Sequence, residues 1–200
     1  WIGPNHAANQ EEIRLLIQQA RAGHADLLII GSEVILRKDV SEEQLIAYIN
    51  QVKQAVPHLK VGTAETYHVW LKLPKLIDSV DIVYVNLYPF WGGVQLDKAN
   101  SVFDTWYKTL KRLVGKKPIV IAETGWPSRG EKIGEAVPSV SNATIYLNQI
   151  MTWQYTHQIP VFFFSAYDEK WKESTKEQRL GGAWGLLDKE GKKKYSKLCY

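Results

Sequence analysis

The sequence of 200 residues predicts one α/β domain built around a parallel β-sheet. Short apolar segments alternate with longer segments in which apolar residues recur at the period of a helix. The short segments are apolar without interruption, which is typical of parallel strands that are covered on both faces. Hydrophobic residues make up 45% of the chain, which is enough for a substantial core, so we expect residues 1–200 to form a single domain.

Five apolar segments are the predicted strands. They are LLII, KVGTA, IVYVNL, PIVIA and PVFFFS at residues 27–30, 60–64, 82–87, 118–122 and 160–165. Each is followed by a segment with helical features. Strands that alternate with helices favour parallel βαβ units.

Three of the segments between the strands show the periodicity of amphipathic helices. The residues expected on their buried faces are Ile13, Leu16, Ile17 and Ala20 in the first helix, Leu45, Ile49 and Val52 in the second, and Ala99, Phe103, Trp106, Leu110 and Leu113 in the third. Ser41 and Gln44 form a predicted capping box, which marks the start of the second helix.

Polar residues directly follow the predicted strands, and this favours a (β/α)-barrel over an open sheet. These residues are Glu33, Glu65, Thr66, Asn86, Tyr88, Glu123, Asp168 and Glu169. In a (β/α)-barrel the carboxyl ends of all strands converge on one mouth, where the active site lies. An open nucleotide-binding sheet would need a G-x-G-x-x-G turn after an early strand, which this sequence lacks. The glycine-rich segment LGGAWG at residues 180–185 is predicted to be a loop, with phosphate binding as the less favoured alternative.

Two glutamates follow strongly apolar segments, Glu33 in LLIIGSEVILR and Glu123 in PIVIAETGWPS. A buried charge without compensation is unfavourable, so each carboxylate needs a partner or a catalytic use. Retaining cleavage of a glycosidic bond uses two carboxyl groups about 5–5.5 Å apart, one as an acid and one as a nucleophile. The structural alternative for either glutamate is to bind a lysine or to cap the next helix. The presence of both favours catalysis.

Four segments resemble, in the expected order, the motifs of glycoside hydrolase family 17, the β-1,3-glucanases and β-1,3-glucanosyltransferases. IVIAETGWPSRG at residues 119–130 resembles the nucleophile motif, and IIGSEVILR at residues 29–37 resembles the acid/base segment. VYVNLYPFW at residues 83–91 fits the strand between them. FFFSAYDEKWK at residues 162–172 resembles the last-strand segment, in which an aromatic run leads to an acidic pair and a lysine.

The resemblance implies roles for individual residues. Glu33 would be the general acid/base and Glu123 the nucleophile, with the Tyr88 hydroxyl orienting the Glu123 carboxylate. The candidates for stacking on pyranose rings are Tyr67, Phe90, Trp91, Trp126 and Trp171, with ordinary packing as the alternative for each. The remaining predicted substrate contacts are Ser32, Asn86, Tyr167, Asp168, Glu169 and Lys172. Ser32 departs from the asparagine of many relatives, and Ser165 departs from the glutamate of many bacterial-type relatives.

The resemblance therefore predicts a secreted or cell-wall associated retaining glycosidase whose partner is β-1,3-glucan or laminari-oligosaccharides. Water would resolve the glycosyl-enzyme intermediate in a hydrolase, whereas a sugar hydroxyl would resolve it in a β-1,3-glucanosyltransferase. A non-catalytic carbohydrate-binding barrel and a phosphate-binding barrel enzyme are the less favoured classes. The sequon formed by Asn142, Ala143 and Thr144 fits a secretory route.

Other partners are not expected. The net charge is +4, but the densest basic run, KEGKKKYSK at residues 189–197, is predicted to be a solvated helix face and not a nucleic-acid arm. The sequence has no run of about 18 apolar residues, so no membrane partner is expected. The five histidines are dispersed without ligand spacing, so no metal or cofactor is expected. Cys199 is the only cysteine, which excludes an intrachain disulfide.

The number of predicted strands is low for this fold. A complete barrel has eight strands in typically about 250 residues. The sequence has five clear strands, and a sixth is expected as a remnant at Trp1 and Ile2. We therefore expect the chain to supply strands three to eight of a TIM (β/α)8-type catalytic barrel that is incomplete at its N-terminal side. Because open apolar sheet edges invite aggregation, we expect these residues to be the C-terminal part of a longer polypeptide. The remainder would be either supplied by an N-terminal companion fragment or absent from this sequence.

Overall fold

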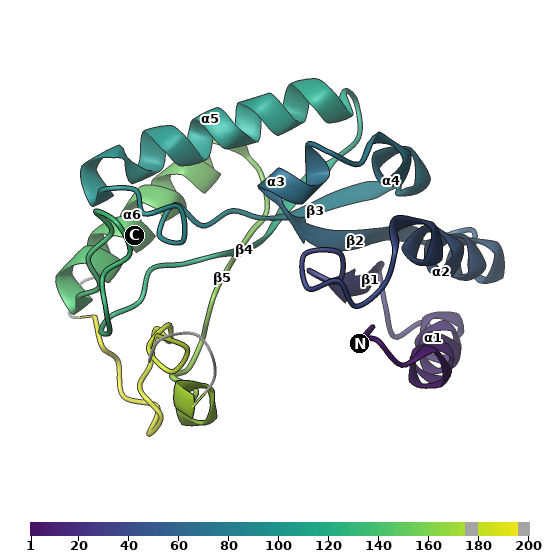
Figure 1. Cartoon of the computed structure of the whole chain (residues 1–200), viewed down its shortest axis with the longest axis horizontal. Coiled ribbons are helices and arrows are strands. Elements are labelled where there is room, and N and C mark those ends of the chain that lie inside the picture. Colours follow the sequence, from purple (N-terminus) through teal and green to yellow (C-terminus); the bar gives the residue numbers. More distant parts are fainter. Residues whose placement is uncertain (175–179, 196–200) are drawn as a thin grey trace. The chain divides into compact units, whose positions relative to one another are not determined.

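Figure 1 shows the computed structural model of the chain, which describes residues 1–174 and 180–195. The chain forms two compact units. The first unit contains residues 1–86 and 109–120, and the second contains residues 87–108 and 121–200. Cys199 lies outside the described residues.

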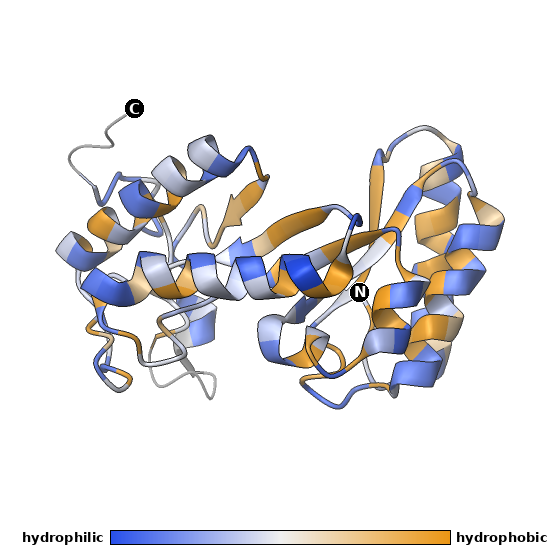
Figure 2. Ribbon diagram, turned by 90° about the horizontal axis from the view of Figure 1, so that it is seen from above, coloured by the Kyte–Doolittle hydropathy of each residue, from blue (hydrophilic) through white to orange (hydrophobic). Residues whose placement is uncertain are grey.

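Five strands form one sheet in the order β1-β2-β3-β4-β5. They are β1 (Leu27–Ser32), β2 (Lys60–Thr66), β3 (Ile82–Asn86), β4 (Ile119–Thr124) and β5 (Val161–Phe163). β1 pairs in parallel with β2, β2 with β3, and β4 with β5. The five predicted strands and their parallel direction in these three pairs are therefore confirmed. Figure 2 shows the strands largely in hydrophobic colours. The expected burial on both faces is confirmed for β3, which is buried throughout. It is wrong for β1, which exposes Leu27 and Ile29, and for β5, which exposes Phe162, because these are the edge strands of the described sheet.

The α-helices are α1 (His6–Arg21), α2 (Glu42–Ala55), α3 (Tyr67–Trp70), α4 (Pro74–Ser79), α5 (Leu96–Val114) and α6 (Val140–His157), and a 3₁₀-helix covers Lys170–Ser174. Helix α1 precedes β1, and the other α-helices lie between strands in the chain. Ser41 caps α2, because its side chain accepts a hydrogen bond from the Gln44 N–H at 3.2 Å.

The predicted sixth strand at Trp1 and Ile2 is wrong, because these residues lie in no strand. The side chain of Asn9, on the second turn of α1, satisfies the neighbouring backbone instead. Its Oδ1 accepts a hydrogen bond from the Gly3 N–H at 2.9 Å, and its Nδ2 donates to the Gly3 carbonyl at 2.7 Å. The N–H and carbonyl groups of Gly3 are thus paired with the Asn9 side chain and not with a strand.

The buried faces of the helices agree with the predicted periodicity except at one end of α5 and at two positions of α1. Ile13, Ala20, Leu45, Ile49, Val52, Ala99, Phe103 and Leu110 are buried, whereas Leu16, Ile17 and Trp106 are half-buried. Leu113 is 46% exposed, and Tyr107 and Val114 are buried in its place. At about 100° per residue, Leu113 points about 80° away from the centre of the face that the five buried residues Ala99, Phe103, Tyr107, Leu110 and Val114 define.

The lysine-rich segment does not form the predicted helix within its described part, residues 189–195. The Asp188 carboxylate accepts hydrogen bonds from the N–H groups of Glu190 at 3.0 Å and Lys192 at 2.8 Å, and Gly191 has a φ of 82°. These contacts stabilise a turn, because a glycine adopts the left-handed conformation without the strain of a side chain. LGGAWG is a loop, as predicted.

Candidate active site

Glu33 follows β1 in a strained backbone conformation that redirects its side chain. The register between β1 and β2 shifts after Ile29, and Glu33 has a φ of 55°, which is uncommon for a residue other than glycine. The Glu33 N–H donates to the Ala64 carbonyl at 2.8 Å, so the residue remains anchored to β2. Such outliers cluster at functional sites because the surrounding structure must stabilise them.

Asn86, the last residue of β3, holds the Glu33 carboxylate. Its Nδ2 donates a hydrogen bond to Glu33 Oε1 at 2.9 Å, and the asparagine is only 2% exposed. The structure therefore brings together two of the predicted site residues of the first unit. A buried amide donor restricts the orientation of the carboxylate that it contacts.

Glu65 at the end of β2 is a buried acid beside Glu33 that the sequence analysis noted but assigned to no site. Its Oε1 accepts a hydrogen bond from the Ile35 N–H at 2.7 Å, so it also holds the loop that carries Glu33. Among the described residues, no hydrogen-bond partner contacts its buried Oε2. Burial raises the pKa of Glu65 to about 7, and the nearby Glu33 carboxylate acts in the same direction against the N–H groups of Ile35 and Leu36. Its position after an apolar strand, like that of Glu33, was the signal that could have identified it.

Glu123 on β4 is held by Tyr88 in the second unit. The Tyr88 hydroxyl donates a hydrogen bond to Glu123 Oε2 at 2.9 Å. The Leu87 N–H donates to the Glu123 carbonyl at 2.9 Å, so the backbones of the two residues lie in fixed register. The orienting contact that the resemblance implied for Tyr88 is present.

Two of the expected stacking residues are part of the core. Phe90 and Trp126 are both 0% exposed, and their ring centroids lie 5.2 Å apart in an edge-to-face contact. Trp126 Nε1 donates to the Val137 carbonyl at 3.0 Å. A stacking face needs an open ring, so in this structure the expectation of sugar stacking is corrected to packing for these two residues.

Three other predicted aromatic residues of the second unit are exposed. Trp91 is 40% exposed, Tyr167 is 53% exposed and Trp171 is 68% exposed. Lys172 forms an ion pair with Glu169 and lies 4.5 Å from the centroid of the Phe164 ring. The exposed rings offer the open surface that stacking on a pyranose requires.

Asp168 is a partner of Lys194 and not an open polar contact. Its Oδ1 accepts hydrogen bonds from Lys194 Nζ at 2.6 Å and from the Gly185 N–H at 2.9 Å. Only 11% of its side chain is exposed. Asp168 thus takes part in a structural ion pair, and its contact with a substrate stays a prediction.

The remaining predicted residues, Ser32 and Tyr67, lie in the first unit and are half-buried. The Ser32 carbonyl accepts a hydrogen bond from Arg37 Nη1 at 2.6 Å, and the Tyr67 ring contacts His68 edge-on at a centroid distance of 5.2 Å. Both residues are close in sequence to the strand ends that carry the acids of this unit.

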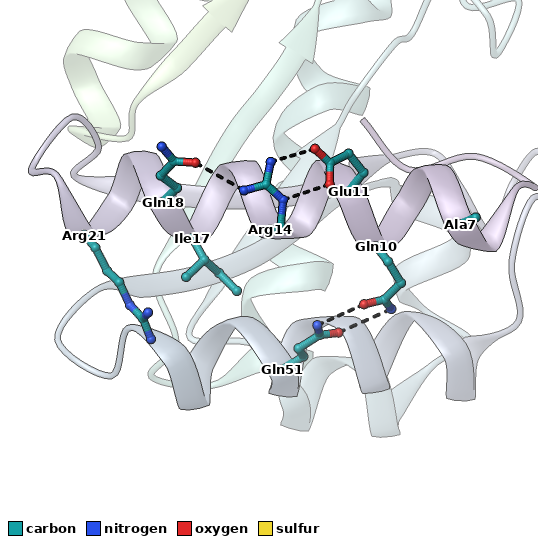
Figure 3. A pocket seen from close by; sticks show the side chains of 8 residues that line it. All are labelled: Ala7, Gln10, Glu11, Arg14, Ile17, Gln18, Arg21 and Gln51. Atoms are coloured by element: carbon teal, nitrogen blue, oxygen red, sulfur yellow. Dashed lines mark hydrogen bonds and ion pairs between the residues drawn. The ribbon is translucent and has the colours of Figure 1, made fainter.

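A hollow of about 720 Å³ lies on the first unit along α1 and α2, and none of the predicted site residues lines it (Figure 3). It is lined by Ala7, Gln10, Glu11, Arg14, Ile17, Gln18, Arg21 and Gln51. Its acid, Glu11, is bound by Arg14, and Gln10 and Gln51 bond to each other. Because these polar groups satisfy one another, the hollow offers no reactive group.

Within residues 1–174 and 180–195, no cluster of three or more His, Cys, Asp or Glu side chains could hold a metal ion. In the same residues, no helix combines the length and the apolarity that crossing a bilayer requires.

Comparison with known proteins relates most of the chain to enzymes that act on glucans. Residues 1–185 match the family described as the BtgE/BtgC glycoside hydrolase domain. A glucan 1,3-beta-glucosidase of Candida albicans is 27% identical over 96% of this chain and 69% of its own length.

Two solved structures of a β-1,3-glucanosyltransferase of glycoside hydrolase family 17 from Rhizomucor miehei share the fold. Each has a TM-score of 0.85 and 30% identity, over 96% of this chain and 71% of the other. One is an active-site mutant in complex with laminaritriose. The parallel α/β fold is therefore similar to that of a family 17 enzyme.

The raised pKa of Glu65 predicts a stability that falls as pH rises. A carboxyl group whose pKa is higher in the folded than in the unfolded state stabilises the fold fully below its pKa in the unfolded state, here near 4.5. This stabilisation is lost as the pH rises through the pKa of the folded state, here about 7. We expect the free energy of unfolding of the wild type to fall between pH 4.5 and 8. Over this range it should fall by up to about 3 kcal/mol more than the free energy of unfolding of Glu65→Gln, because the amide of that variant stays neutral. Urea denaturation across this range measures the difference.

The matched control is Glu131→Gln, which removes an exposed carboxylate of the second unit. It should retain the pH dependence of the wild type. Parallel stability curves for the wild type and Glu65→Gln would contradict the protonation of Glu65 near neutral pH.

Proposed function

The chain belongs to glycoside hydrolase family 17, and on that basis we propose that it cleaves β-1,3-glucan with retention of configuration. The names of its relatives support this substrate, since they include a glucan 1,3-beta-glucosidase and a β-1,3-glucanosyltransferase. The laminaritriose bound to the Rhizomucor enzyme supports laminari-oligosaccharides as the smaller substrates. The fold similarity also supports a (β/α)-barrel as the architecture.

The hydrogen bond from the Tyr88 hydroxyl to Glu123 Oε2, at 2.9 Å, carries the proposal. A nucleophilic carboxylate must present one oxygen to the anomeric carbon, and an oriented donor on the other oxygen fixes that geometry. In this proposal Glu123 attacks through Oε1, the oxygen that the Tyr88 hydroxyl does not contact. Glu123 is therefore the proposed nucleophile.

Glu33 is the proposed general acid/base. The Asn86 amide donates to Oε1, so this oxygen acts as an acceptor and the proton of the acid form belongs on Oε2. A general acid must place its proton within hydrogen-bond reach of the leaving oxygen. The asparagine thus selects which oxygen of Glu33 carries the proton.

The reaction proceeds in two displacements. Glu123 attacks the anomeric carbon, the bond from that carbon to the glycosidic oxygen breaks, and this oxygen takes the proton of Glu33. In the second step water attacks the same carbon, the bond to Glu123 breaks, and Glu33 takes the proton of the water. Two inversions at one carbon give net retention.

Glucanosyl transfer is the second candidate function. A sugar hydroxyl would replace water in the second step, and a bound acceptor competes with water through its high effective concentration. The exposed rings of Trp91, Tyr167 and Trp171 in the second unit favour this candidate, because aromatic rings can hold an acceptor sugar. A non-catalytic carbohydrate-binding protein is disfavoured by the presence of both glutamates.

Substitution of each glutamate should separate the two roles. We expect Glu123→Gln to lose activity on the order of ten-thousandfold or more on every substrate, because no nucleophile remains. Glu33→Gln should lose about a hundredfold or more on laminarin, yet keep the first step on an aryl glucoside whose leaving group needs no proton. Release of the aryl alcohol in the first turnover measures this step.

The control for this experiment is Glu135→Gln, an exposed acid of the second unit, which should keep full activity. If the two glutamine variants respond alike to laminarin and to the activated glucoside, the assignment of roles is wrong. A wild type that binds laminarin without turnover would support the non-catalytic alternative.

Product length should distinguish hydrolysis from transfer. A hydrolase incubated with a single laminari-oligosaccharide yields only shorter products, whereas a transferase also yields products longer than the substrate. We expect the longer products to increase with substrate concentration, because acceptor and water compete for one intermediate. Chromatography of early time points checks this, and the absence of longer products at high substrate concentration would exclude transfer.

We also propose that the protein is secreted or cell-wall associated, since its proposed substrate is a polysaccharide. The sequon supports this, because Asn142 lies near the start of α6 in a partly exposed position. Endoglycosidase treatment of protein from its natural source should lower its mass by that of one glycan. Recovery of unmodified protein in the cytosolic fraction would contradict the proposal.

A further inference from the structure

Lys194 is a buried cation in the lysine-rich segment that the sequence analysis assigned to solvent. Only 12% of its side chain is exposed. Its Nζ donates to Asp168 Oδ1 at 2.6 Å, to Ser128 Oγ at 2.7 Å and to the Ala183 carbonyl at 3.3 Å. An ammonium group has three N–H donors, so these contacts use all of them.

The three acceptors come from three different segments of the second unit. Ser128 lies in the part of the nucleophile motif that follows β4, Asp168 follows β5, and Ala183 belongs to the loop at residues 180–187. Burial lowers the pKa of Lys194, and the Asp168 carboxylate opposes this shift. A buried cation is tolerated only with such partners, so the lysine ties the three segments together.

The loop that Lys194 holds contains Trp184. On one side of this residue, the Ala183 carbonyl also accepts a hydrogen bond from the Ser128 N–H at 2.9 Å. On the other side, the Gly185 N–H donates to Asp168 at 2.9 Å. The Trp184 carbonyl itself accepts from the Ser165 N–H at 3.0 Å. The backbone that carries the indole is therefore held on both sides of Trp184.

The Trp184 ring packs directly against Tyr88 and against the nucleophile loop. It is 2% exposed, and its centroid lies 5.5 Å from that of Tyr88 in an edge-to-face contact with an interplanar angle of 81°. A Cβ atom at Gly125 would lie 3.1 Å from the Trp184 ring and 2.3 Å from the Phe164 carbonyl. Only a glycine fits there, so the indole and the nucleophile loop are in close contact.

We propose that Lys194 is a positioning residue for the nucleophile. By tying Ser128, Asp168 and Ala183 together it holds Trp184 against Tyr88, and the Tyr88 hydroxyl then holds the Glu123 carboxylate. The inference rests on the proposed function, in which Glu123 attacks the sugar. It adds a residue outside the four family-like motifs to the groups on which the reaction depends.

A double-mutant cycle with Tyr88 tests the route through which Lys194 acts. Lys194→Met keeps an unbranched apolar chain and removes the three donors. We expect kcat on a laminari-oligosaccharide to fall on the order of tenfold, with KM changed less than about twofold, because orientation is lost while sugar contacts remain. In a Tyr88→Phe background, which lacks the hydroxyl on Glu123, the same substitution should change kcat less than about twofold.

The matched control is Lys192→Met, which removes the same charge from an exposed lysine two residues away and should leave kcat unchanged. The inference would be overturned if Lys194→Met lowered kcat by the same factor in the wild type and in the Tyr88→Phe background. It would also be overturned if the folded Lys194→Met variant kept the wild-type kcat. If Lys194→Met does not fold, Ser128→Ala replaces it, since it removes one acceptor and keeps the ion pair with Asp168.

A second readout does not depend on activity. Loss of the Lys194 contacts should change the near-ultraviolet circular dichroism of the aromatic cluster around Trp184, whereas Lys192→Met should not. An unchanged aromatic spectrum in Lys194→Met overturns the inference even if the unsubstituted protein shows no turnover. Absence of turnover in the unsubstituted protein counts against the proposed function alone.

Discussion

The parallel pairing of β2 with β3 is the constraint on which the arrangement around Glu33 depends. In this ladder Thr66 pairs with Asn86, so the two strands end at the same edge of the sheet. Asn86 thereby reaches Glu33, which follows β1. A register shift of one residue would turn the asparagine to the opposite face, because side chains alternate along a strand. Glu33 would then lose its amide donor.

The same edge brings two carboxyl groups close together in a largely dry environment. Two neighbouring carboxylates repel each other, and burial disfavours the charge of the deeper one. Glu65 is fully buried and keeps its proton to about pH 7, whereas Glu33 is half-buried. Glu65 also bonds to the backbone of the loop that carries Glu33. Glu65 therefore helps to hold the loop that positions Glu33.

Several aromatic residues of the second unit belong to the core. Trp126, Trp153 and Trp184 are buried there. Tyr88 contacts Trp184, which in turn contacts Phe90, so the group that holds Glu123 rests on a packed aromatic layer. Rigid aromatic packing keeps a catalytic hydrogen bond within the small tolerance that catalysis requires. Trp91, Tyr167 and Trp171 of the same unit keep exposed rings.

The sequence by itself determined the five strands and most of the buried helix faces, and it singled out Glu33 and Glu123 as candidates, because continuous apolarity, helical periodicity and a specific motif are local signals. It could not show that Trp91 is exposed and Trp126 buried, or that Lys192 is exposed and the side chain of Lys194 largely buried. Residues of the same type differ in burial only through the residues that pack against them. Only the tertiary structure decided that Asp168 binds Lys194 and that Asn86 binds Glu33. Burial and long-range hydrogen bonds depend on residues distant in the chain, and their strength depends on the exclusion of water that folding itself produces.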